Sequence, residues 1–205
     1  VYIKASTNKS LLKQINKISQ KAISVFKANE IKEKQKRIKN SILKTKELDS
    51  IGISLTMSSG YKLFKKETNN KFWFQRETQK GSVNLLIYTL PLYKKNPNLE
   101  SIIALRDSIG KAFVPGRNKD SYLITEKAYE PYFFKTKVSS LNTFETRGTW
   151  EVVNDYMAGP FLNYYIKDSK NNRTIVIEGF VFSPSVRKRE YLVELEAIVR
   201  SLKVF

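Results

Sequence analysis

The chain has 205 residues, of which 37 are Lys or Arg and 19 are Asp or Glu, and it contains neither histidine nor cysteine. This composition excludes, within the chain, a Ser-His pair, a Cys nucleophile, a disulfide and any metal site built from His or Cys. No recognised catalytic motif or phosphate-binding loop occurs either. We therefore expect a protein that is not an enzyme and uses no cofactor or metal.

The net charge of +18 is carried by 28 Lys and only 9 Arg, in a chain that also holds 15 Asn. Lys and Asn are abundant in proteins from AT-rich genomes, so part of this charge can reflect coding bias. Nucleic-acid readers usually rely on Arg for bidentate contacts, and that preference is absent here. Nucleic acid is accordingly not an expected partner. The hydrophobic share of 41% is enough for one folded core.

Residues 8 to about 46 are predicted to be helical, with Asn8 as the N-cap. One apolar stripe recurs at three- and four-residue spacing, and a thinner one follows it. The change of pattern near Asn29 predicts a bend or two helices. The first stripe is Leu11, Ile15, Ile18, Ala22 and Val25, and the second is Ile31, Ile38 and Ile42.

The same segment is strongly basic, because residues 1–47 hold 13 basic and 3 acidic side chains. Two interpretations stay open: a solvated face over a packed stripe, or a contact with anionic lipid, glycan or a partner protein. We assign residues 1–50 to a basic helical segment and residues 51–205 to an α+β domain. Val1, Tyr2 and Ile3 resemble the middle of a strand, so we expect upstream sequence before them.

Alternating patterns after residue 51 predict strands, and adjacent Asn residues at 69–70 and 171–172 predict hairpin turns. The segment 83–90 is apolar on both faces and should be a central strand. A helix is predicted over 98–113, and a last helix from Ser183-Pro184, with the proline near its first position. The fold class is thus α+β, an antiparallel sheet covered by helices. The other predicted strands are 60–64, 72–76, 121–126, 131–138, 144–154, 161–167 and 174–182.

Arg106 falls in the middle of the apolar stripe of the 98–113 helix, and Glu178 shares a strand face with Val176 and Phe180. An unpaired buried charge costs several kcal/mol, so each needs a partner. We predict a buried ionic cluster of Arg106 and Glu178, joined by Arg76 or Arg147. Such a cluster is either a structural ion pair or a site for a ligand carboxylate or phosphate.

The segment 146–161 combines aromatic and polar side chains around a Gly-Pro turn. It is either a partner-binding surface or a hairpin whose aromatic side chains fill the core. The candidate contact residues are Trp150, Asn154, Asp155, Tyr156 and Phe161. Paired carboxylates among Glu145, Glu151, Asp155 and Glu178 leave an acid–base enzyme as a weaker alternative.

A series of short motifs covers most of the chain after about residue 50. The motifs are Gly60-Tyr61-Lys62-Leu63, 72–78, 86–89, Arg106-Asp107-Ser108, Val114-Pro115-Gly116, Gly148-Thr149-Trp150-Glu151-Val152, Asn154-Asp155, Gly159-Pro160-Phe161, 178–181 and 195–198. Together they resemble an envelope lipoprotein family of Bacteroidota, the domain of unknown function 4837 family. The fold also looks like the Mog1/PsbP-type α-β-α sandwich, with a long N-terminal helix added.

The resemblance implies a lipid anchor upstream of this chain and a location in the cell envelope, but no activity and no catalytic residue. We therefore expect a non-enzymatic envelope domain that binds a partner protein or glycan through residues 150–161. The alternative is a module that binds a polyanion or an anionic membrane through the basic N-terminal helix.

Overall fold

The computed structural model describes residues 2–43, 46–67 and 70–205, and its centre is an antiparallel sheet. Eight strands of these described residues form the sheet in the order β2-β3-β4-β9-β8-β7-β5, with β6 also paired to β7. A separate two-stranded sheet joins β1 (Ile53–Ser54) to β10 (Lys203–Val204). The large sheet comprises β2 (Lys62–Glu67), β3 (Lys71–Thr78), β4 (Gly81–Pro91), β5 (Leu123–Thr125), β6 (Tyr132–Val138), β7 (Leu141–Val152), β8 (Ala158–Asp168) and β9 (Arg173–Phe182).

The middle of the sheet is buried on both faces. Strand β4 lies between β3 and β9, and six consecutive residues from Val83 to Tyr88 are buried. Strand β9 is buried from Thr174 to Val181. The prediction of a central strand at 83–90 is therefore confirmed. A strand that is apolar on both sides needs a cover on each side, and helices supply it.

Helix α3 (Arg189–Val199) covers one face of the sheet together with the last turn of α1 (Asn8–Ile38) and the short 3-10 helix η1 (Glu47–Ile51). Leu195 of α3 lies over Gly179 of β9, where an added Cβ would come within 2.8 Å of the leucine side chain. The glycine thus allows the helix to pack closely on the sheet.

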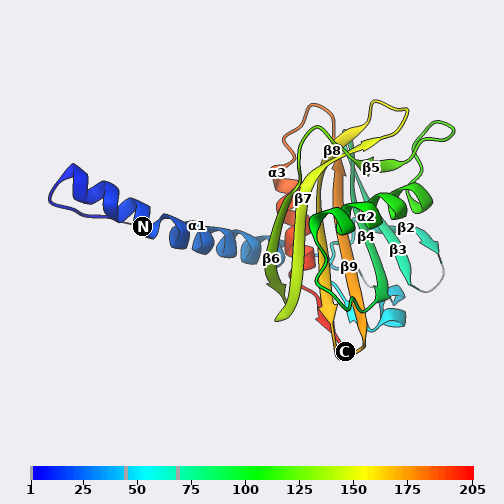
Figure 1. Cartoon of the computed structure of the whole chain (residues 1–205), viewed down its shortest axis with the longest axis horizontal. Coiled ribbons are helices and arrows are strands. Elements are labelled where there is room, and N and C mark those ends of the chain that lie inside the picture. The colour runs from blue at the N-terminus through cyan, green and yellow to red at the C-terminus, as the bar shows by residue number, and fades with distance from the viewer. Residues whose placement is uncertain (1, 44–45, 68–69) are drawn as a thin grey trace.

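Helix α2 (Leu99–Phe113) covers the other face, so the layers are helix, sheet and helix (Figure 1). The predicted α+β class and the α-β-α sandwich with a long N-terminal helix are confirmed. A capping box between Asn98 and Ser101 begins α2. Its apolar side packs on Trp73, Trp150 and Phe180 of the sheet.

Both predicted hairpins are present. Strands β2 and β3 pair across the first turn, whose residues 68–69 lie outside the described part of the chain. Strands β8 and β9 pair across the second, where Asn172 adopts a φ of +50°, in the left-handed region that asparagine tolerates. Two details of the prediction are wrong. The last helix begins at Arg189 rather than at Pro184, and Tyr2 and Ile3 are not in a strand; Val1 is not described.

Helix α1 is one continuous helix of 31 residues, capped by Thr7 rather than by Asn8, and it ends at Ile38 instead of near residue 46. The prediction of two helices that meet near Asn29 is wrong. The first stripe and residues Ile31 and Ile38 of the second instead lie on nearly opposite sides of one continuous helix, at about 100° per residue, and Ile42 lies beyond its end. Ile31 and Ile38 of the second stripe pack against the domain core. Residues 44–45 of the predicted helix are not described.

The N-terminal two-thirds of α1 projects away from the domain (Figure 1). Its side chains from Asn8 to Asn29 are exposed or half-buried, and none is fully buried. The hydrogen bonds that tie α1 to the rest of the chain lie beyond this part, as in the pair Gln35 and Ala197. None of the helices among the described residues combines the length and the apolar content of a membrane span.

Amide hydrogen exchange should be fast in α1 before about residue 29 and slow in the core of the domain. A helix without tertiary contacts is marginal in water, so amides of residues 12–26 should exchange at least about a hundredfold faster than those of β4 and β9. Exchange followed by mass spectrometry on the dilute protein would measure the difference. Strong protection of residues 12–26 would contradict the isolation of this segment.

Candidate functional site

A groove with a volume of about 680 Å³ is bounded by α1, α3, β6 and β7. Three chain segments that are far apart in sequence build it, because α1 leaves the domain where it crosses α3. Most of its lining residues are polar or charged. The lining residues are Ser24, Lys27, Ala28, Ile31, Lys32, Gln35, Phe134, Lys135, Thr136, Glu145, Arg147, Glu196 and Arg200.

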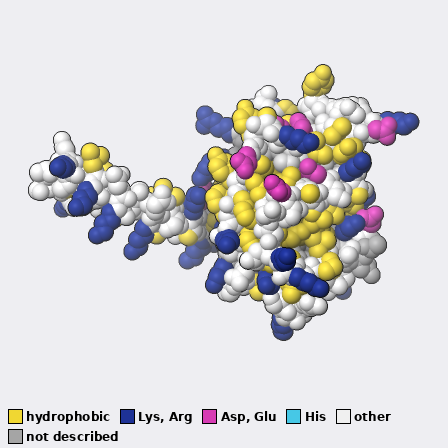
Figure 2. Space-filling view, in the orientation of Figure 1, with side chains coloured by type: hydrophobic (Ala, Val, Ile, Leu, Met, Phe, Trp, Pro, Cys, Tyr) yellow, Lys and Arg dark blue, Asp and Glu magenta, His cyan; other side chains and the backbone are white. Residues whose placement is uncertain are grey.

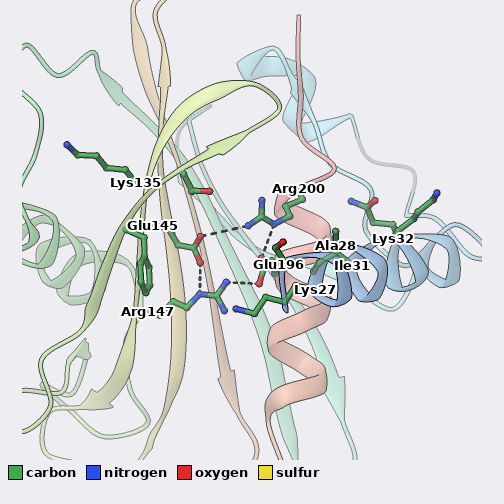
Figure 3. A pocket seen from close by; sticks show the side chains of 13 residues that line it. Lys27, Ala28, Ile31, Lys32, Lys135, Glu145, Arg147, Glu196 and Arg200 are labelled. Atoms are coloured by element: carbon green, nitrogen blue, oxygen red, sulfur yellow. Dashed lines mark hydrogen bonds and ion pairs between the residues drawn. The ribbon is translucent and has the colours of Figure 1, made fainter. Parts of the chain in front are cut away.

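Two arginines and two glutamates form a ring on the floor of this groove (Figure 3). Glu145 and Arg147 are two residues apart on β7 and therefore share a face of the sheet, while Glu196 and Arg200 are one helical turn apart. Arg147 Nη2 lies 2.6 Å from Glu196 Oε2, and Arg200 Nε lies 2.8 Å from Glu196 Oε1. Arg147 Nε also pairs with Glu145.

The ring is partly buried, and its two arginines hold Glu196 ionised. Burial works against the charge on Glu196, but Arg147 and Arg200 outweigh it and lower the pKa of Glu196 below its ordinary value of 4.5. Burial, followed by the charge of Glu145, raises the pKa of Tyr164 well above its ordinary value. Tyr164 therefore stays protonated and donates its O–H to Glu145 Oε1 at 3.3 Å.

Three further cations stand around the groove, and they have no ion-pair partner in the described part of the chain. Lys27 extends from α1 towards Arg147, whereas Lys32 and Lys135 extend outward at the rim (Figure 3). Both carboxylates of the groove, Glu145 and Glu196, are already engaged by the two arginines. The groove thus holds five cations and two carboxylates and presents uncompensated positive charge to solvent.

The predicted partners Arg106 and Glu178 meet on the other face of the sheet, under α2. Arg106 Nη2 lies 2.9 Å from Glu178 Oε1, and both side chains are at most 2% exposed. This contact lies outside hydrogen-bond geometry. Arg106 Nη1 donates to Thr125 Oγ1 at 2.7 Å, and its guanidinium stacks 3.8 Å from the ring centroid of Phe161. Asn163 donates to the other oxygen of Glu178 at 3.0 Å.

Arg76 and Arg147 do not join this pair, which corrects the larger cluster predicted from the sequence. Arg76 pairs with Glu194 of α3 at 3.0 Å, and Arg147 belongs to the ring in the groove. Both arginines therefore point to the α3 face, whereas Arg106 and Glu178 lie on the α2 face. The predicted charged residues divide between two layers because alternate residues of a strand point to opposite sides.

The segment 150–161 contributes most of its aromatic surface to the core. Trp150 and Phe161 are each 1% exposed and pack in the cluster under α2, so they cannot serve as an open contact surface. Trp150 lines a small cavity of about 180 Å³, but Arg106 and Glu178 do not. Arg106, Trp150 and Glu178 are each at most 2% exposed and therefore belong to a closed core.

The turn that follows Trp150 is exposed. Asn154 has a φ of +59°, Asp155 pairs with Arg117 at 2.7 Å, and Tyr156 is fully exposed. One tyrosine beside a satisfied ion pair offers only a small area for contact with a partner.

Of the four carboxylates considered for acid–base work, Glu145 and Glu178 lie on opposite faces of the sheet and cannot flank one substrate. Among the described residues, no group of acidic side chains is arranged to hold a metal ion.

The ring members Glu196 and Arg200 were not among the predicted site residues. Their spacing of four residues on a helix, and the spacing of two between Glu145 and Arg147 on a strand, are signals present in the sequence. Both spacings are common on solvated faces, so neither indicates a site alone. What makes the groove is the crossing of α1 over α3, which no local pattern predicts.

The chain belongs to a family whose model is described as Domain of unknown function (DUF4837) and matches residues 39–201. Helix α1 precedes the matched range. None of the curated proteins compared with the chain matches it.

Two solved structures are similar to the chain in outline. They are a point mutant of the protein Mog1, with 8% identity and a TM-score of 0.44, and the Saccharomyces cerevisiae Ran-binding protein Mog1p, with 11% identity and a TM-score of 0.47. Each match covers 75% of this chain and 90% of the other chain. Such distant likeness carries no argument about function.

Replacing Arg106 with alanine should destabilise the domain strongly. The change leaves Glu178 buried without its cation, which costs about 3–5 kcal/mol of the free energy of unfolding. Urea unfolding measures the loss, with Arg187→Ala, an exposed arginine, as the control. The double variant Arg106→Leu/Glu178→Leu should recover part of the loss. A loss below about 1 kcal/mol for Arg106→Ala would contradict a buried, obligatory pair.

The ring in the groove should make stability depend on pH. The folded-state pKa of Glu196 is lowered, so the unfolded chain binds its proton more readily and stability rises with pH through this range. The stabilisation is present above pH 4.5 and is lost as pH falls through the folded-state pKa. Thermal unfolding should show Glu196→Gln less stable than the parent at pH 7, and the gap should close near pH 3.

Glu130→Gln is the matched control for this experiment, because Glu130 is exposed and forms no ion pair among the described residues. Its unfolding temperature should follow that of the parent at every pH. A gap between parent and Glu196→Gln that is constant from pH 7 to pH 3 would show that Glu196 acts through packing and not through its charge.

Proposed function

We propose that this protein is a non-enzymatic binding domain that holds an acidic segment of a partner protein in the groove between α1, α3, β6 and β7. The observation that carries the proposal is the uncompensated charge of the groove, five cations against two carboxylates that are already paired. A carboxylate-bearing chain would satisfy Lys27, Lys32 and Lys135 without breaking the ring. The ring itself would keep Arg147 and Arg200 in fixed orientations.

The proposal keeps the class of function expected from the sequence but moves the contact from residues 150–161 to the groove. The proposed contact site moves because Trp150 and Phe161 are buried in the core. An envelope location, with a lipid anchor upstream of this chain, is part of the same proposal and rests on the family resemblance. The basic face of α1 continues from the groove through Lys21, Lys17 and Lys13, so a long acidic segment would find further cations along the helix.

A fluorescently labelled peptide of ten glutamates would test the groove. Anisotropy should show binding that weakens steeply with added salt, because exposed charges are screened within about 10 Å at 0.1 M ionic strength. The variant Lys32→Glu/Lys135→Glu should bind at least about tenfold more weakly than the parent at low salt. Both lysines are exposed at the rim, so the fold should be unaffected.

The matched control is Lys119→Glu/Lys170→Glu, which changes the net charge equally at two exposed lysines outside the groove. Equal loss in both double variants would mean that only the overall charge attracts the peptide, and the groove proposal would fail. A heparin fragment of similar charge serves as the second probe. Binding of heparin but not of the glutamate peptide would replace the protein partner with an acidic glycan.

A further inference from the structure

The side of α1 that faces away from its lysines carries an apolar surface with no partner in the described chain. Leu12, Ile15, Ile23, Val25 and Phe26 are between 39% and 62% exposed. Leu11, Ile18 and Ala22 are half-buried beside them. Single exposed apolar residues are ordinary, but a contiguous row along one projecting helix marks an interaction site.

The two kinds of side chain are cleanly separated around the helix axis. At about 100° per residue, these eight apolar residues fall within an arc of about 160°, and the five lysines between residues 8 and 28 fall within an arc of about 120° on the other side. This stretch contains no acidic residue. Figure 2 shows apolar side chains along one edge of the helix and Lys side chains along the other. The apolar arc is Leu11, Leu12, Ile15, Ile18, Ala22, Ile23, Val25 and Phe26, and the lysines are Lys9, Lys13, Lys17, Lys21 and Lys27.

We propose that residues 8–28 of α1 are an interfacial helix that lies on an anionic lipid bilayer, with the apolar arc inserted between the headgroups. Helices that bind at membrane surfaces combine a wide apolar face with lysines on the polar face. The long lysine stems at the borders of the arc reach up to the phosphate groups. An anionic bilayer is the one surface that satisfies both faces of this segment together.

The alternative binding partners, a soluble polyanion and a second copy of the helix, each match only one side of residues 8–28. A soluble polyanion would pair with the lysines and leave the apolar arc in water. A second copy of the helix would meet a surface wider than the narrow seam of a two-stranded coiled coil, and it would bring lysines together without any acidic residue to pair with them. The proposal goes beyond the acidic partner of the groove, because it adds a role for the apolar arc on the opposite side of the helix.

Binding to lipid vesicles tests the inference with the full chain. Vesicles of phosphatidylglycerol and phosphatidylcholine in equal amounts should sediment the protein at least about tenfold more efficiently than vesicles of phosphatidylcholine alone, because basic segments are attracted to anionic surfaces. The variant Ile15→Gln/Phe26→Gln should lose at least about tenfold in partitioning onto the anionic vesicles, since glutamine preserves helix propensity but removes the inserted groups. Circular dichroism would check that the helix persists.

The matched control is Asn16→Gln/Gln20→Ala, two changes on the lysine side of the same helix, which should leave vesicle binding within about twofold of the parent. Equal binding to both kinds of vesicle, or unchanged binding by Ile15→Gln/Phe26→Gln, would overturn the proposal. Sedimentation velocity decides the remaining case: a dimer abolished by Ile15→Gln/Phe26→Gln, without vesicle binding, would assign the apolar arc to a second copy. The glutamate-peptide experiment is independent, because Lys32 and Lys135 lie outside residues 8–28.

Discussion

The need to cover both faces of one sheet determines the rest of this molecule. Strands β4 and β9 are buried on each side along most of their length, so neither face can be left to water. Helix α2 fills one side with its aromatic contacts, and α3 fills the other with the help of the last turn of α1. Only the C-terminal end of α1 is used in this cover. Its remaining turns are not needed for the core, and they are free to serve another purpose.

The need to cover both faces also explains why the charged residues of the sheet form one enclosed pair and one group that is partly exposed to solvent. On the α2 face the sheet is fully covered, so Arg106 and Glu178 are enclosed and act as a structural pair. On the α3 face, Arg147 of β7 lines the groove beside β6 and stays partly exposed, although its partner Glu145 is buried. Charge in the first group stabilises packing, whereas charge in the second is accessible to a ligand.

Local patterns predicted the elements well, because each depends on neighbours in sequence. Residues 98–113 and 174–182 form α2 and β9 almost as expected, and the paired asparagines do mark hairpins. The contact of Arg106 with Glu178 could be anticipated because an unpaired charge on an apolar face is costly. The groove could not be anticipated, because it depends on how α1 packs against α3, which lies far away in the sequence. Trp150 was expected in a contact surface but lies in the core. Composition alone does not separate an exposed aromatic turn from an aromatic core.

The change of apolar stripe along α1 was interpreted as a bend or as two helices, yet one helix runs from Asn8 to Ile38. A continuous helix with differently oriented surfaces at its two ends links the orientations of whatever the two ends bind. Inserting two residues between Ala28 and Ile31 would turn the outer half by about 200° relative to the domain. The spacing of a few residues in the middle of this helix thus sets how the domain is oriented above any surface that its outer half binds.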